Sequence, residues 1–138
     1  MAVLYADASA LVRLVCEEAE SGALRAYLDG ADLVSSELVL TEVPRAVRRA
    51  VMRDPALPLD LLLERTAELI DVLALLPLDR ALLAAAGALA EPALRALDAI
   101  HVASAVDLDP IEAAFVTYDE RQAAAARLAG LRTMAPGA

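Results

Sequence analysis

The stretch AVLYAD at residues 2–7 is an apolar run that ends at an acid. Short continuous apolar runs of this kind are typical of strands buried on both faces of a parallel sheet. Residues 114–119, AFVTYD, form a second such run, which ends at Asp119. Because ligands bind at the carboxyl ends of parallel strands, we expect Asp7 and Asp119 to border a binding crevice. The alternative for each acid is that it only caps the following helix, since Asp is a preferred N-cap.

From these two runs outward, the pattern predicts that strands and helices alternate. Further strands are expected at 31–35, 72–78 and 131–134, and turns at 54–58 and at Asp109–Pro110. Helices are expected at 8–16, 19–28, 37–53 with Ser36 as N-cap, 59–72, 80–90 capped by Asp79, 93–107, and 120–129 ending at Gly130. This alternation predicts an α/β fold with a mainly parallel sheet. The length of 138 residues predicts one domain, residues 1–138.

A third acid, Asp98, lies in the helical stretch ALDAIHVASAV at residues 96–106. Only His101 and Ser104 are also polar there, so the helix is expected to be largely buried. A buried carboxylate needs a partner, because an unpaired buried charge is costly. A metal ion and an Arg both satisfy this need, and the plainest structural alternative is an ion pair with Arg95.

A fourth acid, Glu42, has mainly apolar neighbours in ELVLTEVPRAV at residues 37–47, which predicts a position near the core. The alternative is an exposed Glu that pairs with Arg45 or Arg49 at helical spacing. Pro44 removes a backbone hydrogen bond and clashes with the preceding turn. We therefore expect the helix either to kink near Glu42 or to begin its regular part later.

Together, these acids favour a divalent cation site. Clustered carboxylates repel one another unless positive charge lies among them. The chain has one Cys, one His and no Lys, which excludes a Cys-rich zinc site, a multi-histidine metal site and lysine-based catalysis. Oxygen ligands suit Mg²⁺ or Mn²⁺, and these ions serve phosphodiester chemistry.

The composition narrows the function classes further. Hydrophobic residues make up 59% and the mean hydropathy is +0.54, which excludes intrinsic disorder. The net charge of −9 argues against tight nonspecific binding to nucleic acid, and 3% aromatic residues argue against a base-stacking platform. The N-terminus does not read as a signal peptide and no apolar stretch reaches membrane-spanning length, so we expect a cytoplasmic protein.

Five motifs together resemble the PIN-domain ribonucleases, specifically the VapC-type toxins of type II toxin–antitoxin systems. They are YADASAL at 5–11, SELVLTE at 36–42, RALDAIHVASA at 95–105, VTYD at 116–119 and GLRTMAPG at 130–137. Each motif is degenerate alone, but the ordered set is specific and spans almost the whole chain.

The resemblance implies a three-layer α/β/α sandwich with a five-stranded sheet in the order 3-2-1-4-5. It implies a site with catalytic residues Asp7, Glu42, Asp98 and Asp119, with Ser9 and Thr117 as polar supports. Asp7, Asp98 and Asp119 are the expected ligands of Mg²⁺ or Mn²⁺. The implied reaction is endonucleolytic cleavage of RNA by a metal-activated water. The implied partners are the RNA substrate, a cognate antitoxin protein and a second copy in a homodimer.

Two further features have competing interpretations. The basic residues Arg45, Arg48, Arg49 and Arg53 fall on one helical face, which indicates contacts to RNA phosphates, a solvated face, or an edge of the antitoxin interface. His101 follows Asp98 by three residues and orients it, holds a water beside the site, or is simply a buried, hydrogen-bonded histidine.

Two rival functions also remain. Receiver and haloacid-dehalogenase domains place Asp at strand ends, but they normally use a Lys, which this chain lacks. The main alternative is a catalytically silent PIN-like domain that binds RNA or a protein partner.

Overall fold

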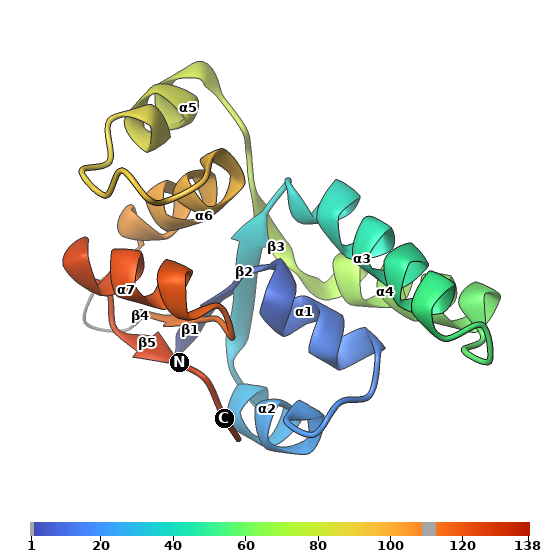
Figure 1. The fold of residues 1–138 in the computed structure, drawn as a ribbon. Helices are drawn as coiled ribbons and strands as arrows, with labels where there is room; N and C mark the ends of the chain where they lie inside the picture. The colour runs from blue at the N-terminus through green and yellow to red at the C-terminus, as the bar shows by residue number, and fades with distance from the viewer. Residues whose placement is uncertain (1, 109–112) are drawn as a thin grey trace.

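The central feature is a parallel sheet, seen in a computed structural model that describes residues 2–108 and 113–138 (Figure 1). Its strands are β1 (Val3–Ala6), β2 (Asp32–Ser36), β3 (Ala74–Leu76), β4 (Ala113–Val116) and β5 (Thr133–Met134). They form a five-stranded sheet in the order β3-β2-β1-β4-β5, and each neighbouring pair is parallel. This confirms the predicted topology.

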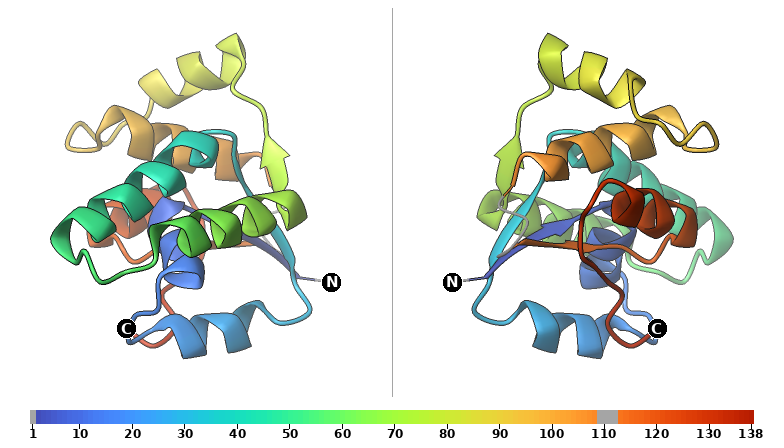
Figure 2. Two further views of the ribbon diagram at one scale, coloured as in Figure 1. Left: turned by 90° about the vertical axis from the view of Figure 1, so that its right-hand side faces the viewer. Right: turned by 90° about the vertical axis from the view of Figure 1, so that its left-hand side faces the viewer.

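Helices cover both faces of the sheet (Figures 1 and 2). They are α1 (Ala8–Val15), α2 (Ser21–Leu28), α3 (Val39–Arg53), α4 (Leu59–Val72), α5 (Arg80–Gly87), α6 (Ala96–Val106) and α7 (Glu120–Leu128). α1, α3 and α4 pack together on one face, with α2 against α1. α6 and α7 pack on the other face, with α5 against α6. The three layers confirm the predicted α/β/α sandwich.

The alternation of side chains along β1 and β4 divides the core between these layers. Leu4 and Val116 are buried with the residues of α1 and α3. Tyr5 and Phe115 point to the opposite face and are buried with residues of α6 and α7. Each such buried side chain contributes on the order of 1.5–3 kcal/mol. Burial on both faces explains why these strands read as continuous apolar runs.

Several predicted boundaries were wrong in detail. Ser36 belongs to β2, and its hydroxyl accepts a hydrogen bond from the Leu38 amide at 3.1 Å, ahead of α3. The helix predicted at 93–107 begins only at Ala96, because Pro92 is followed by a turn in which the Glu91 carboxylate accepts from the Ala93 amide. The predicted helix 80–90 ends at Gly87, and the strands predicted at 72–78 and 131–134 shorten to β3 and β5.

Other local predictions were confirmed. Asp79 caps α5 by accepting from the Leu82 amide at 2.8 Å. Gly130 follows α7 with φ of 90°, a conformation that favours glycine. The predicted turn at Asp109–Pro110 lies outside the described residues. No helix in the described part of the chain is long and apolar enough to cross a membrane.

Pro44 lies inside α3, which is continuous from Val39 to Arg53. The helix begins two residues later than predicted, and its entry is tightened by hydrogen bonds from Leu40 to Glu37 and from Thr41 to Leu38. Because Pro44 has no amide hydrogen, it cannot donate to the Leu40 carbonyl. Glu42 lies ahead of this interruption, in the first turn of the helix.

Candidate functional site

Asp7 lies directly after β1, at the carboxyl edge of the sheet, and is 2% exposed. Its Oδ1 accepts from the Ser9 hydroxyl at 2.6 Å and from the Ala10 amide at 3.0 Å, so it caps α1. Its Oδ2 accepts from the Thr117 hydroxyl. Burial raises the pKa of Asp7, and the Ser9 and Thr117 hydroxyls oppose this by stabilising the charged form. Asp7 therefore has a capping role in addition to its place at the crevice.

Asp119 follows the end of β4 by three residues and caps α7, accepting from the amides of Arg121 at 2.9 Å and Gln122 at 3.2 Å. Its own amide donates to the Thr117 hydroxyl at 3.0 Å. Thr117 is thus a direct link between Asp7 and Asp119. The link depends on the pairing of Ala6 with Val116, which brings the ends of β1 and β4 to one level.

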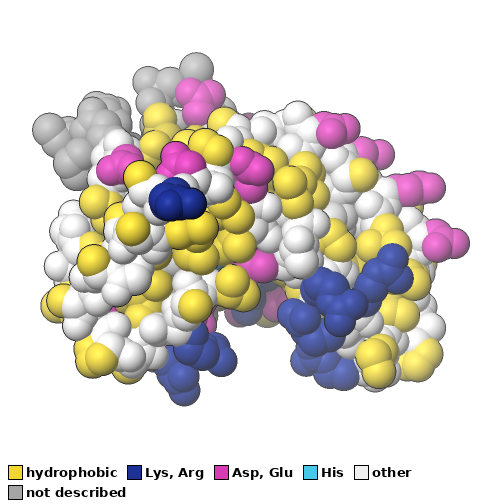
Figure 3. All heavy atoms as spheres, turned by 90° about the horizontal axis from the view of Figure 1, so that it is seen from above, with side chains coloured by type: hydrophobic (Ala, Val, Ile, Leu, Met, Phe, Trp, Pro, Cys, Tyr) yellow, Lys and Arg dark blue, Asp and Glu magenta, His cyan; other side chains and the backbone are white. Residues whose placement is uncertain are grey.

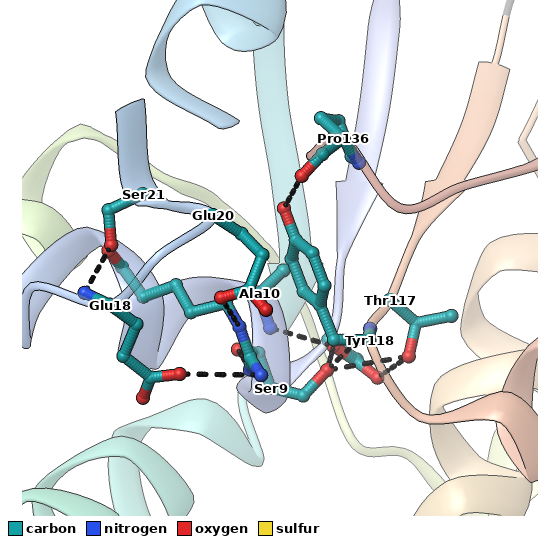
Figure 4. A network of polar contacts seen from close by, with 10 residues as sticks. Ser9, Ala10, Glu18, Glu20, Ser21, Thr117, Tyr118 and Pro136 are labelled. Atoms are coloured by element: carbon teal, nitrogen blue, oxygen red, sulfur yellow. Dashed lines mark hydrogen bonds and ion pairs between the residues drawn. The ribbon is translucent and has the colours of Figure 1, made fainter. Parts of the chain in front are cut away.

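Ser9 connects this pair of acids to the C-terminal segment. Its hydroxyl accepts from the Tyr118 amide at 3.0 Å, and the Tyr118 hydroxyl donates to the Pro136 carbonyl at 2.8 Å (Figure 4). The Arg13 guanidinium lies 4.2 Å from the centroid of the Tyr118 ring and is paired with Glu20 at 3.2 Å. Sequence reasoning missed Tyr118 and Arg13, because no local pattern reports contacts between α1 and the end of β4.

Asp98 lies in the first turn of α6 with its side chain 21% exposed. The predicted ion pair with Arg95 exists, with Nε and Oδ2 3.7 Å apart, but the Arg95 side chain is 74% exposed. Such an exposed, long contact contributes little. Burial, followed by the negative charge of Asp119, raises the pKa of Asp98, and Glu42 acts in the same direction. The carboxylates of Asp98 on α6, Asp119 at the start of α7 and Glu42 on α3 therefore share one electrostatic environment.

Glu42 has an unexpected partner. Its Oε1 lies 2.6 Å from Nε2 of His101, which is 1% exposed. Within the described ranges no ion pair joins Glu42 to Arg45 or Arg49, so the alternative of a pairing at helical spacing is not observed. His101 is a buried, hydrogen-bonded histidine as one interpretation held, but it contacts Glu42 instead of Asp98. The Tyr5 hydroxyl lies 2.8 Å from Nδ1 of the same ring, and this contact was also missed.

A cavity of about 440 Å³ opens between α1 and α3 beside these acids, and Ser9, Glu42, Arg45 and Arg49 contribute to its lining. Basic side chains gather on the α3 side of the face seen from above, next to a recess (Figure 3). Arg48 is exposed and lies outside this lining. The arginine face predicted from sequence is thus divided between a cavity wall and open surface.

The acidic side chains fit a divalent cation in chemistry but are not gathered around one point. All are carboxylates, which suit hard cations, and the charges of Asp119 and Glu42 disfavour ionised Asp98, which a cation would relieve. Among the residues that the structure describes, however, no group of three or more His, Cys, Asp or Glu side chains is close enough to hold one ion. The predicted ligands share one edge of the fold without forming a preassembled cage.

Comparisons with known proteins agree with this fold. The family model described as PIN domain matches residues 4–128. Ribonuclease VapC47 of Mycobacterium tuberculosis is 36% identical, covering 99% of this chain and 98% of that protein. Ribonuclease VapC46 of the same species is 39% identical, covering 99% of each.

A solved structure, VapBC2 from Rickettsia felis bound to a DNA fragment from its promoter, superposes with a TM-score of 0.67. The alignment covers 96% of this chain and 97% of that one. Because the two sequences are only 12% identical, the superposition supports a shared fold alone. The family match and the full-length relatives together show that the chain belongs to the PIN-domain family, among its VapC-type members.

Proposed function

We propose that this protein is an endoribonuclease that acts as the toxin of a toxin–antitoxin pair and depends on Mg²⁺ or Mn²⁺. Asp7, Glu42, Asp98 and Asp119 are the proposed catalytic residues, and Asp7, Asp98 and Asp119 the proposed metal ligands. The observation that carries the proposal is that acids from separate elements meet at one edge of the sheet, where Thr117 bonds to both Asp7 and Asp119. In the same place, burial and then the negative charges of Asp119 and Glu42 raise the pKa of Asp98. The full-length relatives named ribonucleases support the same activity.

The chain's own residues divide the work in this proposal. Thr117 and Ser9 hold the Asp7 carboxylate at the carboxyl edge of the sheet. Asp119 is held by the amino end of α7, while Asp98 and Glu42 approach from helices. A bound Mg²⁺ or Mn²⁺ would neutralise these charges, activate water and stabilise the leaving oxygen.

Arg45 and Arg49 are the proposed contacts to RNA phosphates. Both line the cavity that also contains Glu42, so a phosphate held there would lie next to the acids. Arg guanidinium groups suit phosphate through paired hydrogen bonds. Arg48, which lies outside the cavity lining, is better placed for a protein partner than for the substrate.

The proposed partners are the RNA substrate, a cognate antitoxin and a second copy of the chain. The Rickettsia felis structure is a VapBC assembly, which supports an antitoxin partner. Exposed apolar side chains such as Leu40, Leu61 and Leu97 offer surface for such partners.

A second candidate is a catalytically silent domain that binds RNA or protein. The observation that favours it is that no group of acids in the described residues is preassembled around one ion. Under this alternative, Asp7 and Asp119 are helix caps and nothing more.

Cleavage of RNA separates the two candidates. Purified, antitoxin-free protein is incubated with total RNA and Mg²⁺, Mn²⁺ or EDTA. Asp98→Asn is the informative variant, because Asp98 is partly exposed and caps no helix, whereas Asp7 is a buried cap. Asp71→Asn, an exposed acid on α4, is the matched control. We expect discrete cleavage that needs metal and Asp98 but not Asp71; metal-independent cleavage, or none by folded protein, would contradict the proposal.

A further inference from the structure

His101 is a buried titratable side chain that the proposed chemistry leaves without a role. It lies on α6, is 1% exposed, and has both ring nitrogens engaged by residues from other elements. Nε2 lies 2.6 Å from Oε1 of Glu42 on α3, and Nδ1 lies 2.8 Å from the Tyr5 hydroxyl on β1. The ring therefore joins the sheet to one of the proposed catalytic acids.

The direction of the hydrogen bond to Glu42 follows from the chemistry of its partners. An ionised carboxylate only accepts, so Nε2–H of His101 donates to it. In the neutral ring, Nδ1 then accepts from the Tyr5 hydroxyl. A tyrosine hydroxyl is protonated near neutral pH and can therefore donate this hydrogen bond. Tyr5 also fixes the ring plane, since it meets His101 edge to face at 5.8 Å and stacks on Phe115 at 5.2 Å.

Glu42 needs such a restraint more than the other acids do. Asp7 and Asp119 are short side chains held by backbone amides at helix starts. Glu42 has a longer side chain, with more rotamers to lose, and sits just before the proline in α3. Its side chain is 20% exposed and lines the cavity between α1 and α3, so the contact leaves it accessible from that side.

We propose that His101, oriented by Tyr5, is a positioning residue that fixes the carboxylate of Glu42 at the cavity wall. This inference rests on the proposed nuclease function and adds to it a residue whose effect on the reaction passes through Glu42. A purely structural histidine would stabilise the core without affecting the direction of that carboxylate. The two roles make different predictions for amide replacements.

Two amide variants separate the roles. In His101→Gln, the side-chain amide nitrogen reaches about as far as Nε2 and can still donate to Glu42. In His101→Asn, the shorter amide stops near the position of Nδ1 and cannot. Both replace the ring by a smaller polar group, so a structural role predicts similar losses. We expect kcat to fall by about 10- to 100-fold in His101→Asn, as for a misplaced catalytic group, with KM within about twofold. We expect His101→Gln to recover most of this loss.

A second measurement needs neither RNA nor metal. The chain has one histidine, so ¹⁵N-labelled imidazole gives the signals of His101 alone. We expect an Nε2-bound proton that exchanges slowly with water in the wild-type protein and rapidly in Glu42→Ala. This readout decides the inference if His101→Asn does not fold.

The outcomes distinguish the two levels of the proposal. Wild-type cleavage with equal kcat in the Gln and Asn variants, or an Nε2 proton unaffected by Glu42→Ala, would overturn the positioning role alone. Absence of cleavage by the wild-type protein would overturn the proposed function and this inference with it.

Discussion

Asp7 and Asp98 are proposed for one site but are held in contrasting ways. Asp7 is 2% exposed and accepts from a backbone amide and two hydroxyls. Asp98 is partly exposed, and its ion pair to the exposed Arg95 is long. A carboxylate whose oxygens are already hydrogen-bonded contributes to the fold, whereas a loosely held one is free to move toward a ligand. Within one proposed catalytic set, therefore, one acid mainly stabilises the fold and the other is free to move.

The largest expected difference is in stability. Asp7→Ala removes the cap of α1 and leaves the buried Thr117 hydroxyl without its acceptor, which costs about 2–4 kcal/mol. Asp98→Ala costs less than about 1 kcal/mol, because its contact to Arg95 is exposed and weak. Urea unfolding of the metal-free proteins measures both. Equal losses would break the comparison.

The response to metal sharpens the comparison between Asp7 and Asp98. We expect added Mg²⁺ to raise the melting temperature of the wild-type protein, because a ligand at 100 times its Kd adds about 2.7 kcal/mol of stability. We expect Asp98→Asn to lose this shift and Asp71→Asn to keep it. Thermal unfolding with millimolar Mg²⁺ and with EDTA provides the test; a shift that persists in Asp98→Asn would mean that the ion binds elsewhere.

A contrast of this kind also separates the arginines of α3, some of which line the cavity while others lie on open surface. Arg45→Ala with Arg49→Ala removes both cavity-lining groups, while Arg48→Ala with Arg53→Ala is the matched pair outside the lining. If the two cavity-lining arginines contact two phosphates of single-stranded RNA, their double variant reduces the magnitude of the slope of log binding constant against log salt by about 1.4. The double variant outside the lining leaves this slope unchanged. Binding measured in EDTA at several salt concentrations gives the slopes. Identical slopes in the two doubles would remove the phosphate-binding interpretation.

The smallest expected effect is on pH dependence. Burial and the charge of Asp119 raise the pKa of Asp98 in the metal-free fold. Between the ordinary Asp value, about 3.9, and this higher value, the folded state binds more protons than the unfolded state, so stability falls as pH rises. We expect Asp98→Asn to flatten this fall in EDTA above about pH 4. Chemical unfolding at a series of pH values tests it, and a slope unchanged by the substitution would show that other groups cause it.

The strands could be predicted well because the sequence patterns that mark them are local. Continuous apolar runs identified β1 and β4, and the capping residues Asp7, Asp79 and Asp119 lie next to the helices they begin. The Glu42–His101 contact was missed because its partners are 59 positions apart and on different elements. Tyr5 is 96 positions from His101 and reads as one more apolar strand residue. Such contacts depend on packing between layers, which no local pattern encodes.

The most direct test of the central claim is Mn²⁺ binding to the antitoxin-free protein, followed by electron paramagnetic resonance. We expect saturable binding that is weakened in both Asp98→Asn and Asp119→Asn and retained in Asp71→Asn. This result would show that acids held apart in the fold act as one cation site. Binding that is absent, or that is indifferent to Asp98 and Asp119, would contradict the account.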